Sequence, residues 1–112
     1  MMKTRKQKID GVLAIVIEER EANLSRSEQF KELVQQEINA GERKLIISFI
    51  NVDYVDSSFL GALVAILKSL LPLDGKLVLI GMNDDIVNLF QLTRLDKIFS
   101  LKDSLENALK EF

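Results

Sequence analysis

Two carboxylates and two hydroxyls lie within a short stretch in the middle of the chain, at Asp53, Asp56, Ser57 and Ser58. They follow an apolar segment that ends at Ile50 and precede a longer apolar segment, so they occupy the junction between two elements. A serine at a helix start commonly acts as the N-cap, because its hydroxyl accepts a hydrogen bond from a free backbone N–H. The same hydroxyl can instead carry a phosphate, because the free N–H groups and the helix dipole favour an anion. These residue types leave both interpretations open.

Phosphorylation would change the charge of this junction more than its shape. A phosphate adds roughly −1.5 to −2 charges at neutral pH, and here it would lie beside Asp56 and near Asp53. The fold could tolerate the added charge, whereas a partner protein docked on the junction would meet repulsion and desolvation. The hypothesis is a switch that acts on an interface with little change in the fold.

Composition excludes several other chemistries. The chain has 112 residues, which fits a single domain over residues 1–112, and its 17 acidic and 15 basic side chains give a net charge of −2. Nucleic-acid binding is not favoured, since it usually requires a basic excess. The absence of histidine and cysteine excludes a Ser-His-Asp triad, a thiol nucleophile and the usual transition-metal ligands. Composition leaves acid-only catalysis by Asp53 and Asp56 open. We expect a protein that is not an enzyme and that binds no metal ion or cofactor.

The apolar pattern predicts strands that alternate with helices. Runs rich in β-branched and aliphatic residues indicate buried strands, and apolar residues at helical spacing indicate helices. The predicted strands are Lys8–Ile9, Val12–Ile17, Lys44–Ile50, Lys76–Met82 and Ile98–Leu101, and the predicted helices begin near Ser25, at Ser57, at Asn83 or Asp84, and at Ser104. Alternation of this kind predicts an α/β fold with right-handed crossovers and a mixed, partly parallel sheet. We expect about four to five strands, covered on one side by about four helices.

Pairs of residues at capping-box spacing predict two of the helix starts. Ser25 with Glu28, and Asp103 with Glu106, have the three-residue spacing at which side chains cap each other's backbone N–H groups. Gly61 lies inside the second predicted helix, where glycine costs about 1 kcal/mol relative to alanine. It could permit either a close approach by a partner or tight packing of the helix on the sheet, and packing is slightly favoured.

No apolar run reaches the roughly 18 residues of a membrane span, and the polar N-terminus has no signal-peptide pattern. A cytoplasmic protein without membrane contact is therefore expected. The broadly apolar second helix is compatible with a monomer or a weak homodimer.

The stretch from Val52 to Leu63 resembles the signature of the STAS domain family, which includes bacterial anti-sigma factor antagonists. The family pattern is an apolar or aromatic pair, then Asp-Ser-Ser/Thr-Gly-Leu-Gly, then an apolar helix. A later stretch, from Asp85 to Phe99, is similar to the second conserved region of the family. The order of elements also matches along nearly the whole chain.

This resemblance implies specific roles. Ser57 would be the phosphoacceptor, with Ser58 as the alternative, and Asp56 would help to present the site. The unphosphorylated protein would bind an anti-sigma factor that is also a serine kinase, and a serine phosphatase would reset the switch. The chain would be a substrate and ligand without catalysis of its own. The alternative is an STAS scaffold or interaction module that binds another regulatory protein without phosphorylation.

Departures from the family pattern affect the predicted partner surface. Phe59 stands where the family usually has glycine, and it would either reshape the docking surface or pack in the core. Asn23 replaces a family acid in a loop that contributes to the partner surface, and Arg26 takes the place of a family Ser or Thr. The residues predicted to bind the partner are Asp53, Asp56, Ser58, Phe59, Gly61 and Asn23.

Overall fold

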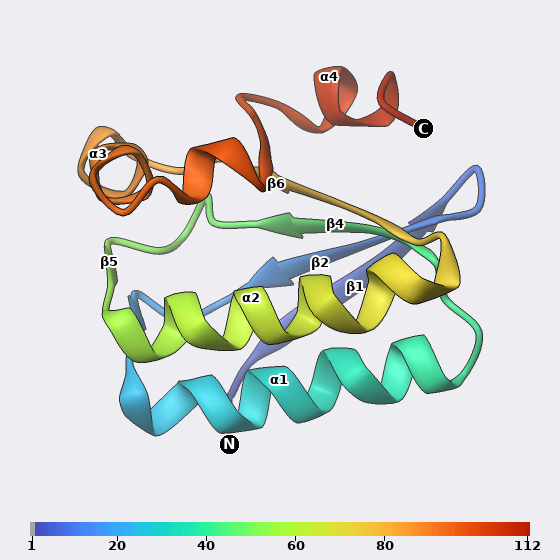
Figure 1. Cartoon of the computed structure of the whole chain (residues 1–112), viewed down its shortest axis with the longest axis horizontal. Helices are drawn as coiled ribbons and strands as arrows, with labels where there is room; N and C mark the ends of the chain where they lie inside the picture. The colour runs from blue at the N-terminus through green and yellow to red at the C-terminus, as the bar shows by residue number, and fades with distance from the viewer. Residues whose placement is uncertain (1) are drawn as a thin grey trace.

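Three apolar strands lie parallel at the centre of the computed structural model, which describes residues 2–112 (Figure 1). Their aliphatic, largely β-branched side chains are suited to strands that are covered on both faces. Shorter or more polar strands pair along the two edges, β1 antiparallel to β2 and β7 parallel to β6. The sheet order is β1-β2-β4-β6-β7, with β1 (Thr4–Ile9), β2 (Val12–Ile17), β4 (Lys44–Ser48), β6 (Lys76–Ile80) and β7 (Ser100–Lys102).

A tight hairpin sets the register of the edge strand. Asp10 and Gly11 both have positive φ, at 51° and 81°, which is the backbone conformation of an Asp-Gly hairpin turn. The turn pairs Ile9 with Val12 and carries the pairing out to Thr4 and Ile17. The first strand is therefore longer than the predicted Lys8–Ile9.

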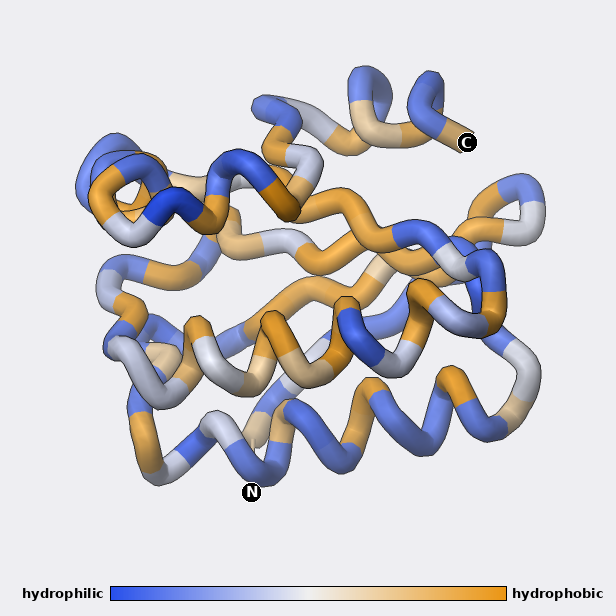
Figure 2. Tube along the Cα trace, in the orientation of Figure 1, coloured by the Kyte–Doolittle hydropathy of each residue, from blue (hydrophilic) through white to orange (hydrophobic). Residues whose placement is uncertain are grey.

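Two long helices cover one face of the sheet, α1 (Leu24–Asn39) and α2 (Ser57–Leu70). Helix α1 buries one apolar stripe, formed by Phe30, Val34 and Ile38, whereas α2 is apolar around most of its circumference (Figure 2). Helix α2 contacts both α1 and the sheet strand β6, and seven of its side chains are buried. Its broad apolar surface is thus explained by contacts within the molecule.

The opposite face of the sheet carries a smaller apolar cluster. Val12, Ala14, Ile46, Val78 and Ile80 pack there against Ala108 of the short helix α4 (Leu105–Leu109). The predicted α/β fold, with a mixed sheet of about four to five strands and about four helices, is confirmed, since residues 2–112 form a five-stranded mixed sheet and four α-helices. The helices, however, are not all on one side: α1 and α2 cover one face and α4 covers the other (Figure 1).

The remaining helix, α3 (Asp84–Leu92), follows β6 and leads into the short 3-10 turn η2 (Leu95–Lys97). Another 3-10 turn, η1 (Leu71–Leu73), ends α2. Two two-residue strands, β3 (Glu21–Ala22) and β5 (Tyr54–Val55), form a separate parallel pair. This pair joins the segment before α1 to the segment before α2. No helix within residues 2–112 is long and apolar enough to cross a membrane.

The two capping boxes are wrong in detail. Helix α1 begins at Leu24 with Asn23 at the N-cap, and the Asn23 side chain accepts no hydrogen bond from a backbone N–H of the helix. Helix α4 is capped by Ser104, whose hydroxyl accepts from the Asn107 backbone N–H at 3.1 Å. Asp103 instead accepts a bond from the Asn107 side chain at 2.7 Å. Helix α3 begins as predicted, since Asn83 Oδ1 accepts from the Ile86 N–H at 2.9 Å.

Candidate functional site

The carboxylate of Asp56 binds the starts of two helices. Its Oδ1 accepts a hydrogen bond from the Phe59 backbone N–H at 3.0 Å, which caps α2. Its Oδ2 accepts from the Leu24 backbone N–H at 2.9 Å, in the first turn of α1. The first N–H groups of any helix lack acceptors within the helix, so Asp56 satisfies one such donor in each. The N-termini of α1 and α2 are thereby held side by side.

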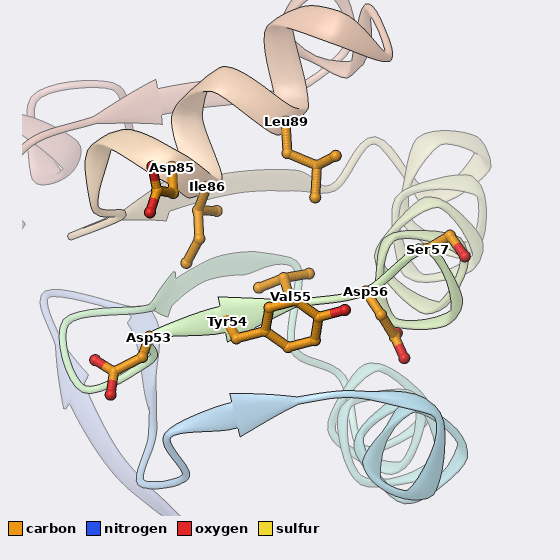
Figure 3. A pocket seen from close by; sticks show the side chains of 8 residues that line it. All are labelled: Asp53, Tyr54, Val55, Asp56, Ser57, Asp85, Ile86 and Leu89. Atoms are coloured by element: carbon orange, nitrogen blue, oxygen red, sulfur yellow. The ribbon is translucent and has the colours of Figure 1, made fainter.

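The helix cap predicted at Ser57 or Ser58 is therefore supplied by Asp56. Ser57 is the first residue of α2 and is exposed, and Ser58 is partly buried. Figure 3 shows the Ser57 side chain at the beginning of α2. An exposed hydroxyl that does not cap the helix is available to an enzyme or a partner protein.

A network of polar contacts positions the segment before Ser57. The Asp53 and Tyr54 backbone N–H groups both donate to the Arg20 carbonyl, at 2.7 and 3.1 Å. The Asp53 carboxylate pairs with Arg20 Nε at 2.8 Å on the exposed surface. On the other side, Asn83 Nδ2 donates to the Asp53 carbonyl at 3.1 Å while its Oδ1 caps α3. Asn83 therefore fixes α3 relative to β5.

A pocket of about 430 Å³ opens between β5 and α3, with Ser57 on its rim. We call it the β5–α3 pocket. Apolar side chains form its middle, and every charged side chain in its lining is a carboxylate. Asp53 and Asp85 lie at one end and Ser57 at the other (Figure 3). It is lined by Asp53, Tyr54, Val55, Asp56, Ser57, Asp85, Ile86 and Leu89.

Asn23 lies in a different hollow, which is mainly polar and contains Glu19, Arg20, Glu21, Ser25 and Arg26. Its side-chain oxygen accepts a bond from the Ser25 hydroxyl at 2.7 Å. Arg26 pairs with Glu19 at 3.5 Å. The structure thus brings Asp53, Asp56 and Ser57 to one pocket and leaves Asn23 beside another.

Phe59 does not belong to the molecular surface. Its side chain is fully buried, its ring stacks on Phe30 with a centroid separation of 5.1 Å, and it forms a T-shaped pair with Phe49 at a centroid separation of 6.3 Å. Of the two interpretations of this residue, core packing is confirmed. The prediction that Phe59 itself contacts a partner is wrong, because its ring fills the space between α1 and α2.

Gly61 is exposed, and a Cβ built on it would meet no atom within 4 Å. The interpretation that this glycine permits tight packing of α2 on the sheet is therefore wrong. The alternative, a close approach by a partner protein, stays a prediction.

Sequence reasoning did not assign Tyr54, Asp85, Ile86 or Leu89 to the site. The spacing of Asp85 and Leu89, one turn apart on a helix, was the available signal, but the contact of α3 with β5 depends on the fold. No group of three acidic side chains within the described residues is arranged to hold a metal ion.

Comparison with known proteins agrees with this architecture. The family model of the STAS domain matches residues 3–108. A protein of Thermotoga maritima, named as an anti-sigma factor antagonist, is 31% identical over 105 residues, which cover 93% of each chain. A crystal structure of such a protein from Thermotoga maritima has a TM-score of 0.87 at 28% identity, with 96% of this chain and 92% of that chain covered.

A more distant structure shares the fold. The Bacillus cell fate determinant SpoIIAA, solved in its phosphorylated form, has a TM-score of 0.74 at 18% identity and covers 99% of this chain and 98% of its own. The match of the family model to nearly the whole chain, together with the identity to the Thermotoga relative, shows that the chain belongs to the STAS domain family and is of the anti-sigma factor antagonist type.

Proposed function

We propose that this protein is a regulatory switch that binds a kinase-type anti-sigma factor and is released when Ser57 is phosphorylated. The observation that carries the proposal is the position of Ser57. Its hydroxyl is exposed on the rim of the β5–α3 pocket, while Asp56 performs the capping that would otherwise engage a serine there.

The relatives support a regulatory role. The Thermotoga protein is named for antagonism of an anti-sigma factor, which implies binding to such a factor. SpoIIAA has been solved with phosphate attached, so a fold of this shape accommodates that modification. We extend both properties to this chain as part of the proposal.

The local charge distribution gives the phosphate a mechanism. A phosphate on Ser57 would lie at the N-terminus of α2, where the dipole and the free N–H groups favour an anion. The folded structure would therefore tolerate it. The added charge of roughly −1.5 to −2 at neutral pH would have to be desolvated when a partner covers the rim of the pocket. The switch would then act by weakening the interface.

The remaining roles follow from this cycle. The protein would be the substrate of the kinase and of a serine phosphatase that restores the binding form, with no catalysis of its own. Because sigma factors act on RNA polymerase inside the cell, the cycle would take place in the cytoplasm. Asp53, Asp56, Ser58 and Gly61 surround Ser57 along the chain and would contribute to the partner surface.

The test combines mapping of the modified residue with a binding measurement. The protein is isolated from its native cell and its phosphorylated residue is identified by mass spectrometry, with the expected phosphate on Ser57. Ser57→Ala should remove the modification and keep partner binding, whereas Ser57→Asp should weaken binding. Ser58→Ala is the matched control, and it should still be phosphorylated.

A phosphate found on Ser58, and lost in Ser58→Ala, would transfer the switch to the alternative residue. Partner binding that is identical in Ser57→Ala, Ser57→Asp and the natural protein would instead favour an interaction module that works without phosphorylation.

A further inference from the structure

The apolar lining of the β5–α3 pocket is followed along α3 by an exposed leucine, Leu92. Asp85, Leu89 and Leu92 are spaced by four and three residues, so they share one face of the helix. Asp85 and Leu89 line the pocket, and the shared face therefore brings Leu92 next to it along the helix. The Leu92 side chain is 83% exposed, and Tyr54, on the opposite wall of the pocket, is 55% exposed.

Exposed leucines are common on protein surfaces when they occur singly. This one differs, because it continues the apolar lining of a pocket whose wall also presents an exposed aromatic ring. A concave surface with a strip of apolar side chains is the kind of surface that binds the apolar face of an amphipathic helix.

The acidic side chains that line the pocket are not equally available to a partner. Asp53 and Asp85 lie at one end of the pocket and Ser57 at the other (Figure 3). Of the three carboxylates in the pocket lining, that of Asp53 is paired with Arg20, and that of Asp56 accepts a backbone N–H on each oxygen. The third, Asp85, forms no ion pair with any residue between 2 and 112. The carboxylate that remains for a partner is therefore that of Asp85, at the end far from Ser57.

We propose that the strip formed by Tyr54, Leu89 and Leu92 is the docking site for an amphipathic helix of the partner protein, whose basic end meets Asp85. The inference rests on the proposed function in one respect, since it takes the partner to be the protein that Ser57 controls. This orientation explains how an acidic pocket can attract a basic segment of the partner although a phosphate on Ser57 weakens partner binding. The attraction acts at Asp85, and the phosphate at the other end meets the part of the partner without basic side chains.

The strip is tested on the whole protein with synthetic peptides, followed by two-dimensional amide NMR. The first probe is a short amphipathic peptide of lysine and leucine with leucines at helical spacing, and the second has glutamate in place of each lysine. The lysine peptide should shift the amide signals of Tyr54, Asp85, Leu89 and Leu92. The glutamate peptide should bind more weakly at the same place.

Variants separate the strip from general stickiness. Leu92→Ser should weaken binding of the lysine peptide about tenfold, as loss of one leucine contact would. The control is Leu71→Ser, because Leu71 is 59% exposed at the other end of α2. This variant should bind the lysine peptide with unchanged affinity. Asp85→Asn should also weaken binding, whereas Asp84→Asn, in the same helical turn but outside the pocket lining, should not.

Shifts centred on Leu71 and Leu73, equal binding of both peptides, or no binding at millimolar concentration would each overturn the proposal. The outcome is independent of the switch itself. A protein that is phosphorylated on Ser57 but fails the peptide test would keep the proposed function and lose the docking strip. A protein that passes the peptide test but carries no phosphate would keep the strip and lose the switch.

Discussion

The backbone N–H of Leu24 donates a hydrogen bond to Asp56 Oδ2 at 2.9 Å, between residues 32 positions apart in the sequence. The second oxygen of the same carboxylate caps α2 through the Phe59 N–H. A negative charge near a helix N-terminus is favoured by the helix dipole, and here one carboxylate lies near two of them. Asp56 therefore has a structural role that is separate from any role in presenting Ser57.

Replacing Asp56 should destabilise the free protein. Loss of an N-cap costs about 1 kcal/mol, and loss of the bond to Leu24 adds about 1 kcal/mol, so Asp56→Ala should lower the free energy of unfolding by about 2 kcal/mol. Urea unfolding measures this difference. Asp56→Asn keeps one acceptor oxygen and should lose about half as much. Equal losses in the two variants would contradict the double cap.

The double cap could not be predicted from the sequence, although much of the fold could. The apolar runs of β2, β4 and β6 specify buried strands by composition alone, and α2 is recognisable by its length. The acceptor for Leu24, by contrast, comes from a distant segment. Strands β3 and β5 are two residues each, too short to show any periodicity, and they are what bring that segment close.

Phe59 should behave as a core residue. Truncating a fully buried phenylalanine to alanine removes apolar contacts and leaves a cavity, at a cost of about 3–5 kcal/mol. Phe59→Ala should therefore lower the denaturant midpoint strongly, and Phe59→Leu should lower it less. Tyr54→Ala is the matched control, because Tyr54 is an exposed aromatic in the same segment. A Phe59→Ala protein as stable as Tyr54→Ala would show that the ring does not hold α1 and α2 together.

The sequence alone did not decide between core and surface for Phe59 or Gly61. Helix α2 is apolar around most of its circumference, so position on the helix does not show which face is covered. The stacking of Phe30 of α1 on Phe59 is what places the Phe59 ring in the core. The open surroundings of Gly61 place it on the surface.

Asp103 should make the stability of the C-terminal segment depend on pH. The hydrogen bond from the Asn107 side chain lowers the pKa of the Asp103 carboxyl. A pKa that is lower in the folded state contributes stability above the unfolded value of about 3.9, and this contribution is lost as the pH falls through the folded value. Asn107→Ala keeps the backbone N–H that donates to Ser104 but removes the side-chain bond.

The variant should therefore be less stable than the natural protein at pH values above the unfolded pKa of about 3.9, and the difference should shrink as the pH falls below it. Urea unfolding at several pH values measures the difference. The carboxyl signal of Asp103 in NMR should titrate at higher pH in Asn107→Ala. A stability difference that stays constant with pH would show that the Asn107 side chain acts through something other than the Asp103 charge.

Gly61→Ala should stabilise the protein on its own. Gly61 is an exposed interior position of α2, and alanine is favoured over glycine there by about 1 kcal/mol, with no atom within 4 Å of the added Cβ. Thermal unfolding should therefore show a higher midpoint. The matched control is Gly75→Ala, where the Cβ would lie 2.6 Å from Leu70 Cδ2 and 3.0 Å from the Arg43 carbonyl oxygen, and the midpoint should fall.

If a partner does approach the bare backbone of α2, Gly61→Ala should weaken binding although it stabilises the free protein. A lower midpoint for Gly61→Ala would contradict the open surroundings of this glycine, and unchanged partner binding would remove it from the docking surface.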